Sequence, residues 1–385
     1  MMMEHFAGGS FRRRREQLGL FEKIKSLNIG LIGAVMAVGM IGCLGLYSAA
    51  NGSFEPYASR HIIRFIVGLI LMLGVALVDI RLWRSAAYPF YVIALCLLIL
   101  VDLKGYIGMG AQRWVDLGFI RLQPSEIMKV ALVMALARFF DKKTAADLNS
   151  FSGLWPVFMM TVLPVILVLN QPDLGTAIMI SALGAVMLFI AGLSWKLIFI
   201  AVTGFIAAVP LAWNMLLKSY QKNRILTFLN PESDPLGAGY HVTQSKIALG
   251  SGGITGKGFL EGTQSHLNFL PEKQTDFIFT LIGEEWGLIG GLTILFFYLI
   301  IFGYGNLIAV SSRNSFGRLL AIGLSINLML YVMINTGMVM GLLPVVGVPL
   351  PMISYGGTAM LTVMFSLGLI LSVSIYRHAR LNSVF

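Results

Sequence analysis

Charged residues are scarce in this sequence of 385 residues, of which 57% are hydrophobic and only 12% charged. A soluble globular protein carries about 25% charged residues. The apolar residues here fall in runs of roughly 18–25, the length that crosses a hydrocarbon core about 30 Å thick. The composition therefore excludes a soluble globular protein and predicts a polytopic membrane protein. The net charge of +10 then reflects loop charge that sets topology, and not a nucleic-acid surface.

Cysteine and histidine are also few, and their positions exclude two kinds of site. Cys43 and Cys96 both stand inside apolar runs, so neither a disulfide framework nor a thiolate metal site is expected. The five histidines are scattered without the spacing of metal ligands, which argues against a histidine-based metal site. The sequence also has no serine or cysteine nucleophile elbow, no repeat of fixed period and no low-complexity tract.

One glycine-rich segment, "GSGGITGKG" (250–258), has the composition of a phosphate-binding loop but not its pattern. Ser251 stands where the first glycine of that motif is needed, and Gly258 stands where serine or threonine should follow the lysine. We expect a flexible turn here, after a short amphipathic helix over 240–249, and no nucleotide site.

Ten apolar runs are long enough to be membrane spans. They cover approximately 29–50, 60–79, 85–103, 124–140, 153–170, 174–193, 195–217, 277–303, 318–338 and 355–376. Residues 1–28 form a basic tail, and no small-residue cleavage site follows the first run, so that run is a retained anchor. The predicted fold class is an all-α polytopic membrane protein. Residues 29–385 form a single ten-helix domain, with a long extracytoplasmic loop (218–276) between the seventh and eighth helices.

The distribution of lysine and arginine predicts the orientation. With the N-terminus inside, the inner segments hold 16 of the 28 basic residues. Six of the others lie on the long segment 218–276, and long loops count little in the positive-inside rule. We therefore expect both termini in the cytoplasm and the long loop outside.

The outer segment 104–129 carries four charged residues close to the membrane: Arg113, Arg121, Glu126 and Lys129. If a helix begins near Pro124, Glu126 and Lys129 share one face and can pair. One interpretation is an ion pair that fixes a re-entrant loop. The other is a cationic cradle for a phosphate group, because guanidinium groups bind phosphate oxygens in a bidentate manner.

Asp276 stands where the long outer segment meets the eighth span, behind the polar residues of "LPEKQT" (270–275). It could cap the following helix, because acidic side chains favour helix N-termini. It could also act as a general base, because partial desolvation and nearby carboxylates raise a carboxyl pKa toward the working range.

Three further carboxylates lie in or beside apolar runs. Glu284 and Glu285 lie roughly 12 Å deeper than Asp276 at 1.5 Å per residue. Their depth demands a polar cavity or partners, which is compatible with a transport path. Asp173, in "NQPDLGTA" (170–177), is expected to break the chain between two helices.

Five motifs, in this order, resemble the SEDS family of shape, elongation, division and sporulation proteins. They are "GAQRWVDLGFIRLQPSEIMK", "NQPDLGTA", "GAGYHVTQSKIALGSGGITGKG", "LPEKQTDFIFTLIGEEWGLIGG" and "NTGMVMGLLPVVGVPLPMISYGGT". The resemblance spans nearly the whole chain, from about Asn28 to Arg377. It is greater to the elongation type, RodA, than to the division type, FtsW, because the division type tends to carry an acidic residue where Asn268 stands.

The resemblance implies an inner-membrane protein that polymerises lipid II into glycan strands, with a class B penicillin-binding transpeptidase and the elongation machinery as partners. The essential aspartate of the family falls on Asp276. Its basic outer positions fall on Arg113 and Arg121, and its fourth-span motif falls on Glu126 and Lys129.

Lys273 and Glu272 complete the set of expected substrate-binding residues. Many members of the family carry histidine where this chain has Gln274, so Gln274 is left out of the catalytic set.

The expected reaction is inverting glycosyl transfer with undecaprenyl pyrophosphate as the leaving group. Asp276 takes the proton of the acceptor hydroxyl, and Arg113, Arg121 and Lys129 stabilise the pyrophosphate charge. No cofactor is implied, although such a transfer is compatible with a divalent cation. Two alternatives stay open at this point: a lipid II flippase that uses Glu284, Glu285 and Asp173, and a non-catalytic scaffold for the transpeptidase.

Overall fold

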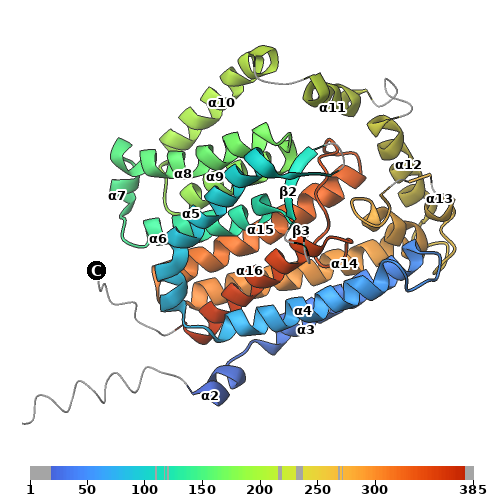
Figure 1. Ribbon diagram of the computed structural model, residues 1–385, viewed down its shortest axis with the longest axis horizontal. Helices are drawn as coiled ribbons and strands as arrows, with labels where there is room; N and C mark the ends of the chain where they lie inside the picture. The colour runs from blue at the N-terminus through green and yellow to red at the C-terminus, as the bar shows by residue number, and fades with distance from the viewer. Residues whose placement is uncertain are drawn as a thin grey trace, which may run out of the picture.

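The computed structural model describes residues 19–108, 111–116, 118, 121–215, 219–230, 237–267, 269–270 and 272–377. The chain is mostly helical, and its long helices form one bundle (Figure 1). The helices are α2 (Leu20–Lys25), α3 (Ile29–Ala49), α4 (Ala58–Leu77), α5 (Ile80–Lys104), α6 (Pro124–Phe140), α7 (Ala145–Leu148), α8 (Phe151–Asn170), α9 (Leu174–Ile190), α10 (Trp195–Met215), α11 (Ser219–Leu229), α12 (Ala238–Ser251), α13 (Thr263–His266), α14 (Ile278–Ser311), α15 (Ser315–Val339) and α16 (Gly357–Ile375).

A helix lies at each of the ten predicted spans, but these helices differ in length and polarity. Within the described residues, seven are long and apolar enough to cross a membrane: α3, α4, α5, α8, α14, α15 and α16. Helices α6 and α9 have 17 residues each, and α10 has 21. The chain is therefore a multi-pass membrane protein, and the count of ten crossings stays a prediction.

Burial separates central helices from peripheral ones. Helices α15 and α16 are largely buried, and α6 buries nearly every side chain, including charged ones. The outer helices α4 and α5 expose large apolar side chains instead, such as Ile70 at 67% and Leu103 at 76%. Because exposing such a continuous apolar surface to water is energetically costly, this surface faces lipid.

Close packing of α4 against α16 depends on small residues. A Cβ on Gly368 would lie 2.6 Å from the backbone oxygen of Met72, and one on Gly68 would lie 2.9 Å from Met364. Helices in lipid associate through such van der Waals contacts and not through a hydrophobic driving force, so small interfacial residues bring the backbones together.

The prediction of an all-α chain is wrong in one segment. Strands β1 (Tyr106–Gly108), β2 (Ala111–Asp116) and β3 (Arg121–Leu122) form a small antiparallel sheet in the order β1-β2-β3. The segment lies outside the apolar runs and has Gly118 at a bend with a φ of +84°, so its backbone groups are satisfied by strand pairing rather than by a helix.

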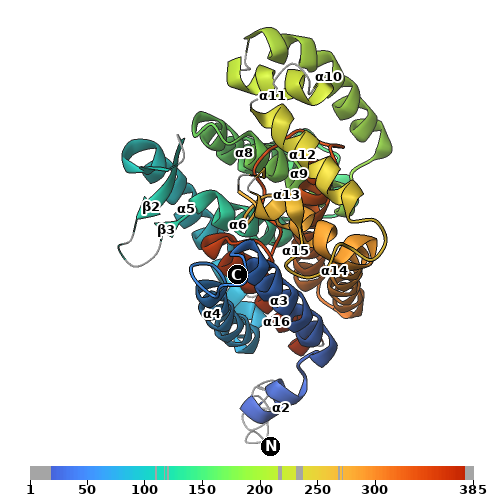
Figure 2. The ribbon, with the colours of Figure 1, turned by 90° about the vertical axis from the view of Figure 1, so that its right-hand side faces the viewer.

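In its described residues, the predicted loop 218–276 contains the helices α11, α12 and α13. The expected helix over 240–249 is present as part of α12, which packs against α14 and α15. In both views α10 and α11 lie apart from the main bundle, and α12 leads the chain back to it (Figures 1 and 2).

The two ends of the bundle hold different parts of the chain. Helix α2 and the C-terminal end of α16 lie at one end, and the sheet, α12 and α13 lie at the other (Figure 1). Basic side chains bind backbone and carboxylate groups at the first end: Lys23 Nζ donates to Leu77 O at 3.1 Å, and Arg84 pairs with Asp141 at 2.6 Å.

Candidate active site

Asp276 lies just before α14, at the end of the bundle opposite to α2 and the C-terminal end of α16, and its backbone is fixed by two other parts of the chain. Asn335 Nδ2, on α15, donates to Asp276 O at 3.0 Å. Ser354 Oγ donates to Thr275 O at 2.6 Å, and Tyr355 N donates to Gln274 O at 2.8 Å. These hydrogen bonds hold residues 274–276 against α15 and the loop that precedes α16.

The side chain of Asp276 does not cap α14. The cap residue of that helix is Phe277, which makes no side-chain cap hydrogen bond. Within the described residues the Asp276 carboxylate accepts no hydrogen bond. A Cβ on Gly347 would lie 3.5 Å from Asp276 Oδ2, and Gly347 has a φ of +72°. The carboxylate therefore faces the loop 341–348 at a position where glycine leaves room for a ligand.

The surroundings of Asp276 change its acidity. Desolvation, together with the negative charge of Glu272, raises the pKa of Asp276 from 3.8 to about 6, and the positive charge of Arg224 opposes this rise. Such a carboxyl is still ionised at neutral pH and is a stronger base than an ordinary aspartate.

Glu272 and Lys273, two of the predicted substrate-binding residues, have different environments. Glu272 is exposed and accepts hydrogen bonds from Thr275 Oγ1 at 3.0 Å and Gln274 Nε2 at 3.3 Å. Lys273 is only 8% exposed, and its Nζ donates to Ser265 O at 2.9 Å. Desolvation lowers the pKa of Lys273, against the opposing effect of Glu285. Lys273 thus ties the Asp276 segment to α13.

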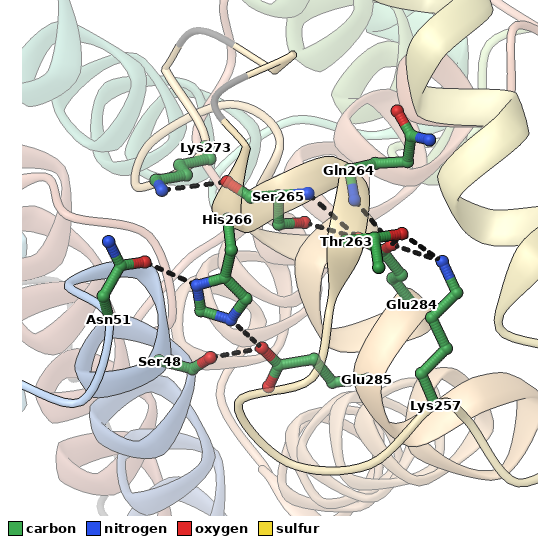
Figure 3. A network of polar contacts seen from close by, with 10 residues as sticks. All are labelled: Ser48, Asn51, Lys257, Thr263, Gln264, Ser265, His266, Lys273, Glu284 and Glu285. Atoms are coloured by element: carbon green, nitrogen blue, oxygen red, sulfur yellow. Dashed lines mark hydrogen bonds and ion pairs between the residues drawn. The ribbon is translucent and has the colours of Figure 1, made fainter.

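Glu284 binds the chain around α13 through several donors (Figure 3). Lys257 Nζ donates to its carboxylate at 2.8 Å, the backbone of Gln264 at 2.9 Å and the backbone of Ser265 at 3.1 Å. Ser265 Oγ adds a fourth bond at 2.8 Å. A fully buried carboxylate is stable only with such partners.

Glu285 makes a second set of contacts, toward α3. His266 Nε2 lies 3.0 Å from Glu285 Oε1, and the Ser48 hydroxyl donates to the same oxygen. His266 Nδ1 lies 2.5 Å from Asn51 Oδ1 (Figure 3). Glu284 and Glu285 therefore act as one clamp that joins α3, α13 and α14 and fixes the segment leading to Asp276.

The glycine-rich segment 250–258 packs on the backbone of α14 where that helix is interrupted at Gly287. Gly287 has a φ of +65°, and a Cβ there would lie 2.3 Å from Gly256 N. Lys257 N donates to Glu284 O at 3.1 Å, and Leu288 N donates to Gly253 O at 2.9 Å. The glycines thus allow two backbones to approach and to exchange hydrogen bonds, which hold the expected turn against α14.

The sequence did not indicate this clamp or this packing. The one available signal was the depth of Glu284 and Glu285, which required partners whose identity depends on the tertiary fold.

Arg113, on β2, is held at the turn between α8 and α9. Its Nε donates to Gln171 O at 3.2 Å, a second nitrogen donates to Pro172 O, and a third lies 3.9 Å from Asp173. Asp173 caps α9 by accepting from Thr176 N at 3.2 Å, which agrees with its expected place between two helices.

Arg121 lies on β3 with 59% of its side chain exposed, 3.5 Å from Asp116. Its guanidinium is therefore accessible from outside the bundle, at the rim of the sheet.

Glu126 and Lys129 form the predicted pair, at 2.6 Å, and both are almost completely buried. The Tyr331 hydroxyl donates to Glu126, and Lys129 Nζ lies 4.1 Å from the centre of the Tyr331 ring. This geometry favours the structural interpretation of the pair over the cationic cradle, because the Lys129 charge is already compensated.

The loop 341–348 connects these groups to Asp276. Val348 packs with Met179 and Tyr331, next to Lys129, and Asn335 Nδ2 donates to both Val348 O (2.8 Å) and Asp276 O. The structure thus places Glu126 and Lys129 beneath the loop as support.

A pocket beside the same loop contains two basic residues that the sequence interpretation did not single out. Its lining includes Arg224 from α11, Lys246 from α12, and residues of the segment 341–345. The excess of basic residues in 218–276 was visible in the sequence, but which of them converge was not.

No group of three or more histidine, cysteine, aspartate or glutamate side chains gathers as a metal site within the described ranges.

Comparison with known proteins places this arrangement in a family. The model of the FtsW, RodA and SpoVE cell cycle proteins matches residues 24–379. Peptidoglycan glycosyltransferase MrdB of Escherichia coli (strain K12) is 45% identical over 336 residues, which cover 87% of this chain and 90% of that protein.

Two solved structures share the fold. One, from work on the structural coordination of polymerization and crosslinking by a peptidoglycan synthase complex, has a TM-score of 0.80 and 29% identity, and covers 92% of this chain and 99% of that chain. The other, the rod shape determining protein RodA of Thermus thermophilus, has a TM-score of 0.68 and 26% identity, with 92% and 98% covered. The chain therefore belongs to the FtsW, RodA and SpoVE family, also called the SEDS family.

Proposed function

We propose that this chain is a peptidoglycan glycosyltransferase that polymerises lipid II into glycan strands during cell elongation. The observation that carries the proposal is Asp276: a partly buried carboxylate with a raised pKa, rigidly held at the outer end of a membrane bundle. Its relatives by sequence and structure include a named peptidoglycan glycosyltransferase and a rod shape determining protein.

The proposed reaction is a single displacement at the anomeric carbon of the lipid-linked donor. Asp276 accepts the proton of the acceptor's 4-hydroxyl while its oxygen forms the new bond to that carbon. The bond to the pyrophosphate oxygen breaks, and its electron pair leaves with the polyprenyl pyrophosphate. One displacement inverts the configuration, so an α-linked donor gives a β-linked strand without a covalent enzyme intermediate.

The ionised state of Asp276 at neutral pH fits the role of base. A base must lie within about 3 Å of the hydroxyl that it deprotonates, so its position must be fixed before substrate arrives. The hydrogen bonds to the backbone of residues 274–276 supply that rigidity.

For localisation, we propose the bacterial inner membrane with both termini in the cytoplasm and Asp276 at the outer face. The end of the bundle that holds α2 and the C-terminal end of α16 carries basic residues such as Lys23, Arg84 and Arg138, as expected of a cytoplasmic face under the positive-inside rule. Because α4 and α5 expose apolar side chains to lipid, the substrate's lipid tail can stay in the bilayer beside the protein while its head group reaches Asp276.

For partners, we propose a class B penicillin-binding transpeptidase within the elongation machinery. The support is the likeness to the structure from the peptidoglycan synthase complex, whose description joins polymerization to crosslinking. We propose a substrate contact for Arg121, which is exposed at the outer rim, and for Glu272, which is exposed beside Asp276. The other predicted substrate-binding residues act by positioning neighbouring parts of the chain through the contacts described above: Arg113, Lys129, Glu126 and Lys273.

The flippase alternative loses its main support in this geometry. Glu284, Glu285 and Asp173 each bind structural partners, so they do not form a chain of groups waiting for a transported ligand.

The test is lipid II polymerisation by the purified chain with its transpeptidase, with Asp276→Asn as the variant. We expect glycan from the wild type and none from the variant. Movement of lipid II between leaflets without any glycan would favour the flippase, and normal polymerisation by the variant would remove Asp276 from the mechanism.

A further inference from the structure

The pocket between α11, α12 and the segment 341–345 has two chemically different walls. Arg224 and Lys246 supply positive charge, and Phe228, Val242 and Val345 supply apolar surface. A small anion alone needs no apolar wall. The combination fits an anionic group attached to a hydrocarbon, because each wall then meets a matching part of one ligand.

The charges of Arg224 and Lys246 are available for a ligand. In the part of the chain that the structure describes, neither side chain takes part in an ion pair, whereas Arg113 lies beside Asp173 and Lys129 beside Glu126. Lys246 is exposed, and Arg224 is partly buried.

The loop 341–347 links this pocket directly to Asp276. At its start, the Lys246 side chain lies across Gly341, where a Cβ would come within 2.7 Å of Nζ and 2.1 Å of Cε. At its end, Gly347 faces the Asp276 carboxylate. Both glycines have positive φ, +71° and +72°, a conformation that other residues rarely adopt, so the path of the loop between Lys246 and Asp276 depends on them.

Arg224 is also close enough to Asp276 to favour its ionised form. The pocket and the carboxylate therefore belong to one electrostatic environment.

We propose that Arg224 and Lys246 bind the pyrophosphate of the lipid-linked donor, the leaving group of the transfer, with its first isoprene units against the apolar wall. The assignment rests on the proposed function and adds the residues that stabilise the departing charge.

Distance distinguishes the donor from the acceptor. A base about 3 Å from the hydroxyl and a hydroxyl about 3 Å from the anomeric carbon place the leaving oxygen within roughly 8 Å of the carboxylate. The acceptor's own pyrophosphate lies a whole disaccharide away from its reacting 4-hydroxyl. Arg224, which acts on the charge of Asp276, and Lys246 in the same pocket thus suit the leaving group, whereas Arg121, exposed on β3, suits the acceptor.

The charge balance of the step agrees with this assignment. As the anomeric carbon–oxygen bond breaks, an electron pair moves onto the pyrophosphate while Asp276 becomes neutral by taking the acceptor's proton. Negative charge therefore moves from Asp276 toward Arg224 and Lys246, and cations that bind it more strongly in the transition state lower the barrier.

The first experiment measures binding alone, on the Asp276→Asn protein in complex with its transpeptidase, so that turnover does not interfere. Farnesyl pyrophosphate is the probe, and Arg224→Gln and Lys246→Gln are added singly and together. We expect each single change to weaken binding about tenfold, the cost of a lost charge-assisted contact. Lys222→Gln, which removes a charge from the same helix α11 outside the pocket lining, should leave binding unchanged.

The second experiment measures polymerisation with Asp276 intact. Arg224→Gln and Lys246→Gln should lower kcat at least tenfold with little change in KM for the acceptor, and Lys246→Arg should restore most of the rate. A thermal midpoint like that of the wild type identifies variants that fold.

The outcomes separate the two proposals. Farnesyl pyrophosphate that binds as tightly to the folded double variant as to Asp276→Asn alone overturns the pocket assignment, even if polymerisation is confirmed. If the pocket variants weaken farnesyl pyrophosphate binding but the wild-type complex makes no glycan, the pocket assignment stands and the proposed function is overturned.

Discussion

Lowering the pH from 7 to 5 should slow glycan synthesis by this protein about tenfold. With a pKa of about 6, the Asp276 carboxyl is roughly 90% ionised at pH 7 and roughly 10% ionised at pH 5. An aspartate with the ordinary pKa of 3.8 would lose less than about 10% of its ionised form over the same range. The two cases are therefore easy to distinguish in kcat/KM.

Two neighbouring charges make this prediction directional. Glu272→Gln removes the negative charge that raises the pKa of Asp276, so the acidic limb of the pH profile should move to lower pH. Arg224→Gln removes the positive charge that lowers this pKa, so the limb should move to higher pH, whatever the loss in maximal rate.

The assay is lipid II polymerisation by the complex with the transpeptidase between pH 4.5 and 8, with thermal unfolding at each pH to exclude denaturation. A rate that stays constant down to pH 5 in a folded protein, or limbs that move in the same direction for both variants, would refute the reasoning.

Three further predictions concern stability and are measured as thermal or chemical unfolding in detergent. Asp276→Asn should stabilise the protein by about 1–3 kcal/mol at pH 7, because a folded-state pKa raised above 3.8 makes ionisation of Asp276 in the folded protein costly. This gain should vanish near pH 4, where the carboxyl is protonated in the folded protein. A variant that is less stable than the wild type at pH 7 would contradict the prediction. Lys129→Met should cost about 3–5 kcal/mol by leaving Glu126 buried without its cation, and Glu126→Gln added to it should recover part of that loss. Gly256→Ala should destabilise strongly, since its Cβ would lie 2.0 Å from Glu285 O, whereas Gly250→Ala, with open space around it, should be neutral or stabilising.

The membrane helices could be predicted from the sequence because each is an almost uninterrupted apolar run with recognisable ends. Asn28, Asp173 and Asn314 each cap the helix that follows them, and Pro124 stands at the first turn of α6. The boundary of α14 was harder to predict. The span was expected to end at residue 303, but the helix continues eight residues further, to Ser311, because it runs through the glycine-containing segment "GYGN" (303–306) as regular helix.

The sheet over 106–122 and the clamp at Glu284 could not be predicted, for a shared physical reason. Both depend on pairing between residues whose partners are set by the fold. Lys257 and Glu284 are 27 positions apart, and nothing local to either one indicates the other. The position of a carboxylate in an apolar run indicates that it needs hydrogen-bonding or charged partners, but not which residues those partners are.

The candidate site was predicted in part. The family resemblance indicated Asp276, and the geometry adds a physical reason in its raised pKa and fixed backbone. The pair Glu126–Lys129 was predicted from its spacing of three residues and is present. Its burial under Tyr331, and the convergence of Arg224 with Lys246, follow from how the loop 341–348 packs, which spacing along the chain does not encode.

The measurement that tests the central claim most directly is lipid II polymerisation by the wild-type complex and by the Asp276→Asn complex, side by side at pH 7, with equal amounts of bound transpeptidase. The account predicts long glycan strands from the wild type and none from the variant, although the variant is folded and at least as stable. Strands of equal length and yield from both complexes would contradict it.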